Sequence, residues 1–451
     1  MFTQKKPLSL KQHALKPAIS RYLSFHERAP ETLAHFAEGK GCCSGLTTVV
    51  LFGLFMSKQP KNKDQTYYDD WPRIKKTLRA ILEWNPPTTA DDKSSYIEPE
   101  FERLIGQIIY YQAIGDYLPV TQGEIQRSFF TTYPHPLRKE YTLAGLFTAE
   151  HLTRTVKVGK IETSILGVLL KEEHRMILIS TGRHALGLLR HGNDIYLHNA
   201  NSRRIKKYCL NDLSSLAKAI FTCGLYDSEV VPCQFGFRVF SFAKKPAIYP
   251  SQENILQALN PPITSSVLVN QKKPMALMIA IRVESIPSAK YYLEKGAPVD
   301  ELNHNNHTPL YNAVKHNNHA LIKLLLQHHA TIHQQNSNQN SALQLAASSG
   351  NIAVVKILLE HTPHSHFGNL LTALSYLPNK KQREELLERI RKNKLKVMLQ
   401  DGYDELLLHE AEKNYPSHLT TLLYKTYRSL FGTTKHHPND CAPNLPTIRR
   451  S

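Results

Sequence analysis

A cysteine pair follows a glycine-rich turn near the N-terminus, at the point where an apolar helix is expected to begin. Cys42 and Cys43 come directly after Gly39-Lys40-Gly41 and precede an apolar run from Leu46 to Met56. A thiol at the start of a helix faces the positive end of the helix dipole and N–H groups without helical partners, and both favour the thiolate. Backbone N–H groups in such a turn also suit an oxyanion. The segment therefore predicts a nucleophilic cysteine.

A histidine and an asparagine lie on two expected strands joined by a short turn. His184 falls in the segment 176–190, and Asn199 falls in the return strand 195–201, with the sequence HGND of residues 191–194 between them. A tight hairpin predicts that His184 and Asn199 lie directly opposite each other, about 5 Å apart. In that position the amide of Asn199 would hold the imidazole as a general base. His184 follows Cys43 by 141 residues, within the interval of about 130–150 residues found in papain-like enzymes.

These short motifs carry a family resemblance. Gly41-x-Cys43-x-Gly45-Leu46, His184-Ala185 and the strand end Asn199-Ala200-Asn201 resemble the motifs of the YopT-like cysteine proteases of bacterial pathogens and symbionts. The resemblance implies an α+β papain-like cysteine protease domain. It also implies that Cys43 is the nucleophile, His184 the base and Asn199 the orienting residue.

The chain departs from the family pattern at two places. Asn199 stands where the family has aspartate, a replacement that papain tolerates, and residues 36–40 lack the glutamine that usually contributes to the oxyanion hole. Cys42 is the alternative nucleophile. The Gly-x-Cys and Cys-x-Gly-Leu spacings favour Cys43.

A 33-residue period marks the region that follows. The period aligns three sets of positions: Leu277, Leu310 and Leu343; Ala280, Ala313 and Ala346; Leu293, Leu326 and Leu359. The middle copy opens with Thr308-Pro309-Leu310, which places proline in the first turn of a helix, where a missing N–H costs little. This is the pattern of ankyrin repeats, and three copies are about the minimum for a stable stack. A degenerate fourth copy is expected near Leu370.

The composition divides the rest of the chain into segments. We expect a cysteine-protease-like domain over residues 1–245, a proline-rich linker with one short helix over 246–270 and an all-α ankyrin solenoid over 271–378. An amphipathic C-terminal helical region over 379–433 would cap the last repeat, and a basic disordered tail would follow over 434–451.

Composition excludes several classes of protein. The 451 residues are 41% hydrophobic and 21% charged, as in a folded soluble chain. Six dispersed cysteines argue against a disulfide framework, and without a Cys-x-x-Cys pair we expect no metal and no cofactor. The longest apolar run has about 11 residues, against about 20 for a membrane span, and no secretory signal peptide is expected at the N-terminus.

The charge and the domain order indicate the kind of partner. A net charge of +18 favours acidic partners, but no recognised motif supports direct nucleic-acid binding, and we expect a monomer. A protease-like domain followed by ankyrin repeats resembles the ankyrin-repeat type IV effectors of Legionella. This resemblance implies secretion into a host cell and a role in virulence there. Basic residues from Arg389 to Lys396 are an alternative signal for nuclear import or nucleic-acid contact, so action in the host cytoplasm or nucleus is expected.

The repeats would then bind a host protein. The expected contact surface is the concave helix face and the hairpin tips, such as 334–340 and the residues Asn303, His304, Asn305, Asn306 and His307. The alternative is that these polar tips serve only solubility. The expected activity is hydrolysis of a peptide or amide bond. The alternative is a catalytically inactive protease fold that acts as an ankyrin-based binding module and sequesters a host factor.

Overall fold

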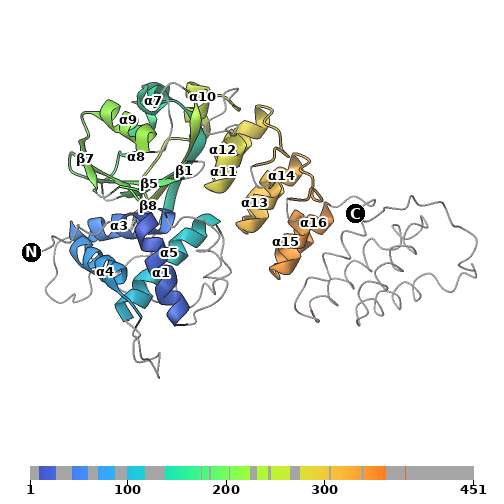
Figure 1. Ribbon diagram of the computed structural model, residues 1–451. Coiled ribbons are helices and arrows are strands. Elements are labelled where there is room, and N and C mark those ends of the chain that lie inside the picture. Colours follow the sequence, from blue (N-terminus) through green and yellow to red (C-terminus); the bar gives the residue numbers. More distant parts are fainter. Residues whose placement is uncertain are drawn as a thin grey trace, which may run out of the picture. The chain divides into compact units, whose positions relative to one another are not determined.

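The computed structural model describes residues 10–26, 43–58, 70–86, 99–116, 138–173, 175–181, 184–202, 204–223, 231–241, 245–264, 275–303, 306–336, 340–361 and 381. The chain divides into two compact units, Met1–Ala342 and Leu343–Ser451. The first unit holds a β-sheet, the helices that cover it and the first two helix pairs of the repeat region (Figure 1).

A six-stranded antiparallel sheet forms the centre of the first unit. Its strands follow the order β1-β8-β4-β5-β6-β7. Their bounds are Arg138–Phe147 (β1), Cys233–Ser241 (β8), Arg175–Ser180 (β4), Ala185–His191 (β5), Asp194–Asn199 (β6) and Lys206–Cys209 (β7). A separate two-stranded ribbon pairs β2 (Val156–Val158) with β3 (Ile161–Thr163). Every residue of β4 is buried, so this sheet is covered on both faces.

Among the described residues, four helices cover one face of the sheet. They are α1 (Gln12–Phe25), α3 (Cys43–Ser57), α4 (Trp71–Glu83) and α5 (Pro99–Asp116). Helix α3 is apolar on all sides, as expected for a helix enclosed within a core, and residues 44–56 are all buried. Gly187 lets α3 approach β5, because a Cβ there would lie 2.5 Å from Leu51 Cδ1 and 2.6 Å from Thr47 Cγ2.

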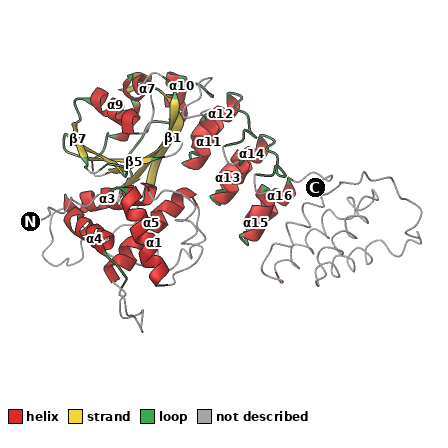
Figure 2. Ribbon diagram, viewed as in Figure 1, coloured by secondary structure: helices red, strands yellow, loops and turns green. Residues whose placement is uncertain are grey.

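Shorter helices cover the opposite face. They are α7 (Ala149–Thr153), α8 (Ile165–Leu169) and α9 (Leu213–Cys223), and Figure 2 shows them across the sheet from the α3 layer. Phe221 of α9 packs on Phe235 of β8 with ring centroids 4.8 Å apart, and Phe235 stacks on Phe237 at 6.0 Å. The two layers leave the strands β4, β5 and β8 in the middle of the core.

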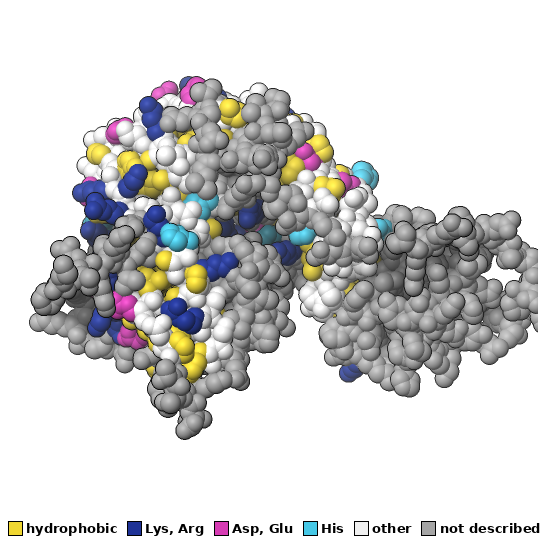
Figure 3. Space-filling view, in the orientation of Figure 1, with side chains coloured by type: hydrophobic (Ala, Val, Ile, Leu, Met, Phe, Trp, Pro, Cys, Tyr) yellow, Lys and Arg dark blue, Asp and Glu magenta, His cyan; other side chains and the backbone are white. Residues whose placement is uncertain are grey.

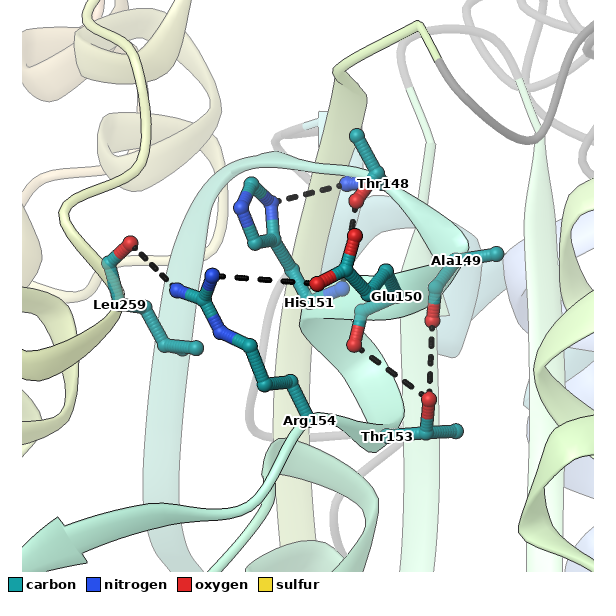
Figure 4. A network of polar contacts seen from close by, with 7 residues as sticks. All are labelled: Thr148, Ala149, Glu150, His151, Thr153, Arg154 and Leu259. Atoms are coloured by element: carbon teal, nitrogen blue, oxygen red, sulfur yellow. Dashed lines mark hydrogen bonds and ion pairs between the residues drawn. The ribbon is translucent and has the colours of Figure 1, made fainter.

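Helix α10 (Gln252–Leu259) lies within the segment that the sequence predicts as a linker, and polar contacts tie it to the sheet domain. Arg154 follows α7, and its Nη2 donates to the carbonyl oxygen of Leu259 at 3.0 Å (Figure 4). Its Nη1 forms an ion pair of 3.9 Å with Glu150 Oε1. Thr148 and His151 close the start of α7 with reciprocal hydrogen bonds of 3.1 and 3.2 Å. The C-terminal end of α10 is therefore held by Arg154 at the end of α7.

The repeat region consists of helix pairs at a constant spacing. Their bounds are Ala276–Arg282 (α11), Ile286–Glu294 (α12), Pro309–Lys315 (α13), His319–Gln327 (α14), Ala342–Ser348 (α15) and Ile352–Glu360 (α16). The first helices of successive pairs start 33 residues apart, and so do the second helices. Asn318 caps α14 in the first unit and Asn351 caps α16 in the second, each accepting from a backbone N–H three residues on.

The first helix pair of the repeats packs against the edge strand β1. Ser288 Oγ accepts a 3.1 Å hydrogen bond from the buried N–H of Ala144, and receives a second from Ser285 Oγ at 2.9 Å. Gly145 has no side chain there, and the hydroxyl of Tyr292 occupies the space of its Cβ. A pairing edge that would otherwise be open is thus covered by the chain itself.

Several expectations concern residues outside those described. They are the degenerate fourth repeat near Leu370, the helical region 379–433 apart from residue 381, and the tail 434–451. None of the described helices has the length and apolar character that crossing a bilayer requires.

Ser288 provides a test of the contact between the repeats and the sheet. Ser288→Ala leaves the buried N–H of Ala144 without its acceptor, and we expect the free energy of unfolding to fall by about 1–3 kcal/mol in urea denaturation. Lys290→Ala, on an exposed position of the same helix, is the control and should change stability by less than about 1 kcal/mol. If both substitutions lower the free energy of unfolding equally, the hydrogen bond of Ser288 does not stabilise this contact.

Candidate active site

Cys43 is the first residue of α3. Its side chain is half-buried against the core that α3 forms with α1, α4 and α5. The thiol therefore stands at the positive end of the helix dipole, on a helix held firmly by its neighbours. Cys42, the alternative nucleophile, lies outside the described residues.

His184 lies directly before β5 and is hydrogen-bonded to Thr181. Its carbonyl accepts from the N–H of Thr181 at 2.8 Å, and its own N–H donates to Thr181 Oγ1 at 3.0 Å. The side chain is only 4% exposed. These bonds fix the backbone of His184. The direction of its ring then depends on the side-chain partner that it contacts.

That partner is Asn199, at the end of β6. His184 Nε2 lies 2.7 Å from Asn199 Oδ1, and Asn201 donates its backbone N–H to the same oxygen at 2.8 Å. A backbone N–H can only donate, so the atom that accepts from it is the amide oxygen and not the amide nitrogen. An oxygen that accepts from Nε2 requires the proton of the neutral ring on Nε2. The second nitrogen, Nδ1, therefore carries the lone pair of a base.

The predicted cross-strand pairing of His184 with Asn199 is wrong by two residues. The observed partner of Asn199 is Leu186, because the turn is centred on Gly192 and Asn193 instead of His191 and Gly192. Gly192 has φ of 60°, a left-handed conformation that glycine adopts readily and that suits the first turn position. His184 still reaches Asn199 along the diagonal, since residues two apart share a face.

A second histidine, which the sequence analysis did not select, joins this hairpin to the cysteine helix. His198 Nδ1 lies 3.2 Å from Thr47 Oγ1, and Thr47 is one helical turn after Cys43. His198 is 6% exposed, and burial first, then the charge of His184, lowers its pKa to about 3. It is therefore a neutral hydrogen-bonding group. Alternation along β6 places the apolar Ile195 and Leu197 on the face away from α3, so the strand pattern gave no signal for this contact.

The electrostatic environment of His184 is set by burial and by Asn199. Burial lowers the pKa of the His184 imidazole below its ordinary value, and the hydrogen bond to Asn199 opposes that effect. The side chains of His184 and Asn199 are in direct contact, and Cys43 begins the helix that packs on their strands. Among the described residues, no group of three or more His, Cys, Asp or Glu side chains is arranged to hold a metal ion.

The predicted protein-binding tip of the repeats has a structural function of its own. Asn303 accepts from the N–H of His307 at 3.0 Å through its side chain, and its N–H donates to the carbonyl of His307 at 3.0 Å. Asn336 and Asn340, one repeat later, form the same reciprocal pair. Asn306 adopts φ of 53° between these contacts. His304 and Asn305 lie outside the described residues.

The exposed surface near the far edge of the sheet is basic. Lys and Arg side chains gather beside β7 (Figure 3), where Arg204, Lys206 and Lys207 are exposed. Lys207 forms an ion pair of 2.8 Å with Asp194. A positive surface of this kind favours acidic partners.

Comparison with known proteins identifies the repeat region. A family model described as ankyrin repeats (3 copies) matches residues 277–368, so the chain contains ankyrin repeats, a module that supports protein binding. No curated protein matches the chain.

Two solved structures show limited similarity. The ankyrin repeat domain of Bcl-3, a member of the IkappaB protein family, is 25% identical over 30% of this chain, with a TM-score of 0.26. The chain spans 63% of that domain. The ubiquitin-specific protease encoded by murine cytomegalovirus tegument protein M48 is 15% identical over 49% of this chain and 88% of its own, with a TM-score of 0.23. At these TM-scores neither likeness bears on the fold or the chemistry.

The protonation of His184 is measurable. In Cys43→Ser protein, which has no thiolate at position 43, we expect NMR titration of the His184 ring to give a pKa below its ordinary value. Asn199→Ala in the same background should lower this pKa further, because it removes the hydrogen bond that favours the charged ring. Ser202→Ala, on an adjacent turn, is the control. A pKa that rises in Asn199→Ala would contradict the assigned contact.

Proposed function

We propose that the part of the chain around the six-stranded sheet is a papain-like thiol hydrolase that cleaves a peptide or amide bond. The observation that supports this most directly is the double use of Asn199 Oδ1, which accepts from Asn201 N–H and His184 Nε2. That arrangement prepares Nδ1 of His184 as a base. Cys43, at the start of the helix that packs on the same strands, supplies the nucleophile.

The proposed reaction proceeds in two stages. The Cys43 thiol transfers its proton to His184 Nδ1, and the thiolate attacks the substrate carbonyl carbon. Electrons of the C=O bond move to oxygen, and on their return the C–N bond breaks while Nδ1–H protonates the leaving amine. Water then attacks the thioester carbonyl carbon while its proton passes to Nδ1. The C–S bond breaks, Nδ1–H returns the proton to the Cys43 thiolate, and the carboxylic acid leaves. Throughout, the ring of His184 donates its Nε2–H to Asn199 Oδ1.

We further propose that the ankyrin repeats bring the hydrolase to its substrate. Ankyrin repeats support protein binding, and their first helix pair is attached to β1 by Ser288 and Tyr292. A partner held by the repeats would therefore be tethered to the sheet domain at a high local concentration. The domain order and the cysteine, histidine and asparagine motifs support a bacterial effector that is secreted into a host cell and acts on a host protein.

An electrophile tests the thiol site. Because an unperturbed thiol is only about 3% ionised at neutral pH, an activated Cys43 should react with iodoacetamide up to about 30-fold faster than an ordinary thiol. Cys209 is an exposed thiol of the same chain and serves as the internal reference in peptide mapping. His184→Ala should reduce the Cys43 rate to that of Cys209.

The neighbouring cysteine requires its own control. Cys42→Ser should retain the fast labelling if Cys43 is the nucleophile, whereas fast labelling confined to Cys42 would reverse the assignment. If no cysteine reacts faster than Cys209, the hydrolase proposal fails. The binding module without catalysis would then be the better description.

A further inference from the structure

The N-terminal helix makes two hydrogen bonds to the loop that follows Asn199. The backbone N–H of Gln12, the first residue of α1, donates to the carbonyl of Ala200 at 2.9 Å. The side-chain Nε2 of Gln12 donates to Asn201 Oδ1 at 2.6 Å. One residue thus holds two successive residues of a loop 189 positions further along the chain.

The same loop orients the candidate active site. Asn201 donates its N–H to Asn199 Oδ1 at 2.8 Å, and this oxygen holds His184 Nε2 at 2.7 Å. A continuous series of contacts therefore runs from Gln12 through Asn201 and Asn199 to the imidazole. A displacement of Asn201 would change the direction of the N–H that fixes the amide of Asn199.

Helix α1 is a rigid support for this series. Leu15, Ile19 and Tyr22 are fully buried in the core shared with α3, and Arg21 donates to the carbonyl of Trp84 beyond the end of α4 at 2.7 Å. Side chains fixed by packing hold a functional group more precisely than side chains on a mobile surface.

The amide of Gln12 is itself only partly satisfied. Its Oε1 is buried and has no hydrogen-bond partner among the residues that the structure describes. An unsatisfied buried amide oxygen is unfavourable for stability, and such a group calls for an explanation. An amide held by its nitrogen alone is consistent with a residue placed to hold Asn201.

We propose that Gln12 is a positioning residue of the thiol site, which sets the His184 ring through Asn201 and Asn199. The proposal rests on the proposed hydrolase function for its consequence in catalysis. The geometric claim concerns the ring of His184 and is testable without catalysis. It also makes the N-terminal helix a part of the site instead of only a cover for the sheet.

Three full-length variants isolate the side-chain contact. Gln12→Met keeps the length of the side chain and the backbone bond to Ala200 but removes the donor. Gln12→Lys keeps a donor for Asn201 Oδ1. His13→Met, on the next and exposed position of α1, is the matched control.

The first measurement is the rate of iodoacetamide reaction at Cys43 as a function of pH. Loss of one hydrogen bond in the series should slow labelling at neutral pH by about 3- to 10-fold in Gln12→Met. Gln12→Lys should recover most of the rate, and His13→Met should match the unaltered protein. A wild-type rate and pH profile in Gln12→Met would overturn the proposal, whatever its effect on stability.

The second measurement keeps the two proposals separate. In Cys43→Ser protein, NMR titration reports the His184 ring whether or not the thiol is reactive. Gln12→Met should lower the pKa of His184, because a less well-held Asn199 gives less support to the charged ring. His198, the titratable neighbour on β6, stays neutral over this range because its pKa is about 3.

The combined outcomes are distinct. A shifted His184 titration with an unreactive Cys43 would support Gln12 and refute the hydrolase. An unchanged titration with a reactive Cys43 would refute Gln12 and leave the hydrolase intact.

Discussion

The enclosure of α3 is the constraint on which the rest of the first unit depends. A helix that is apolar on every side must be covered on every side, so the sheet lies on one flank and α1, α4 and α5 occupy the others. Gly187 gives the backbone of β5 the room for this approach. Because Cys43 begins the same helix, the packing that encloses α3 also determines where the thiol stands relative to the hairpin.

Asn199 is the point at which the elements of the site meet. The residue before it, His198, contacts Thr47 on α3, and the residues after it contact Gln12 on α1. Its own side chain fixes the tautomer of His184. Helices α1 and α3 lie in the same layer and both contact the end of this strand, so the orientation of the imidazole depends on that helical layer.

The ankyrin repeats extend the sheet domain directly. Ser288 satisfies a backbone donor of the edge strand, and Lys139 of β1 pairs with Glu284 at 2.9 Å across the same contact. The burial of an edge strand by the first helix pair joins that pair to the sheet, and the compact unit continues past the sheet domain to Ala342. The first two helix pairs of the repeats and the candidate hydrolase therefore belong to one compact unit.

The sequence by itself determined the features that depend on local periodicity. The 33-residue period identified the repeats, the unbroken apolar run identified α3, and the HGND segment identified the hairpin. It also selected Cys43, His184 and Asn199, although their catalytic function stays a prediction. Only the tertiary structure decided the register, because a glycine with positive φ moved the turn by one residue and the pairing by two.

Only the tertiary structure, likewise, revealed Gln12, Thr47 and His198. Their contacts join segments from 151 to 189 residues apart, and no local pattern encodes such a contact. A period or an apolar run is written in neighbouring residues, whereas a hydrogen bond across the core exists only after the chain has packed.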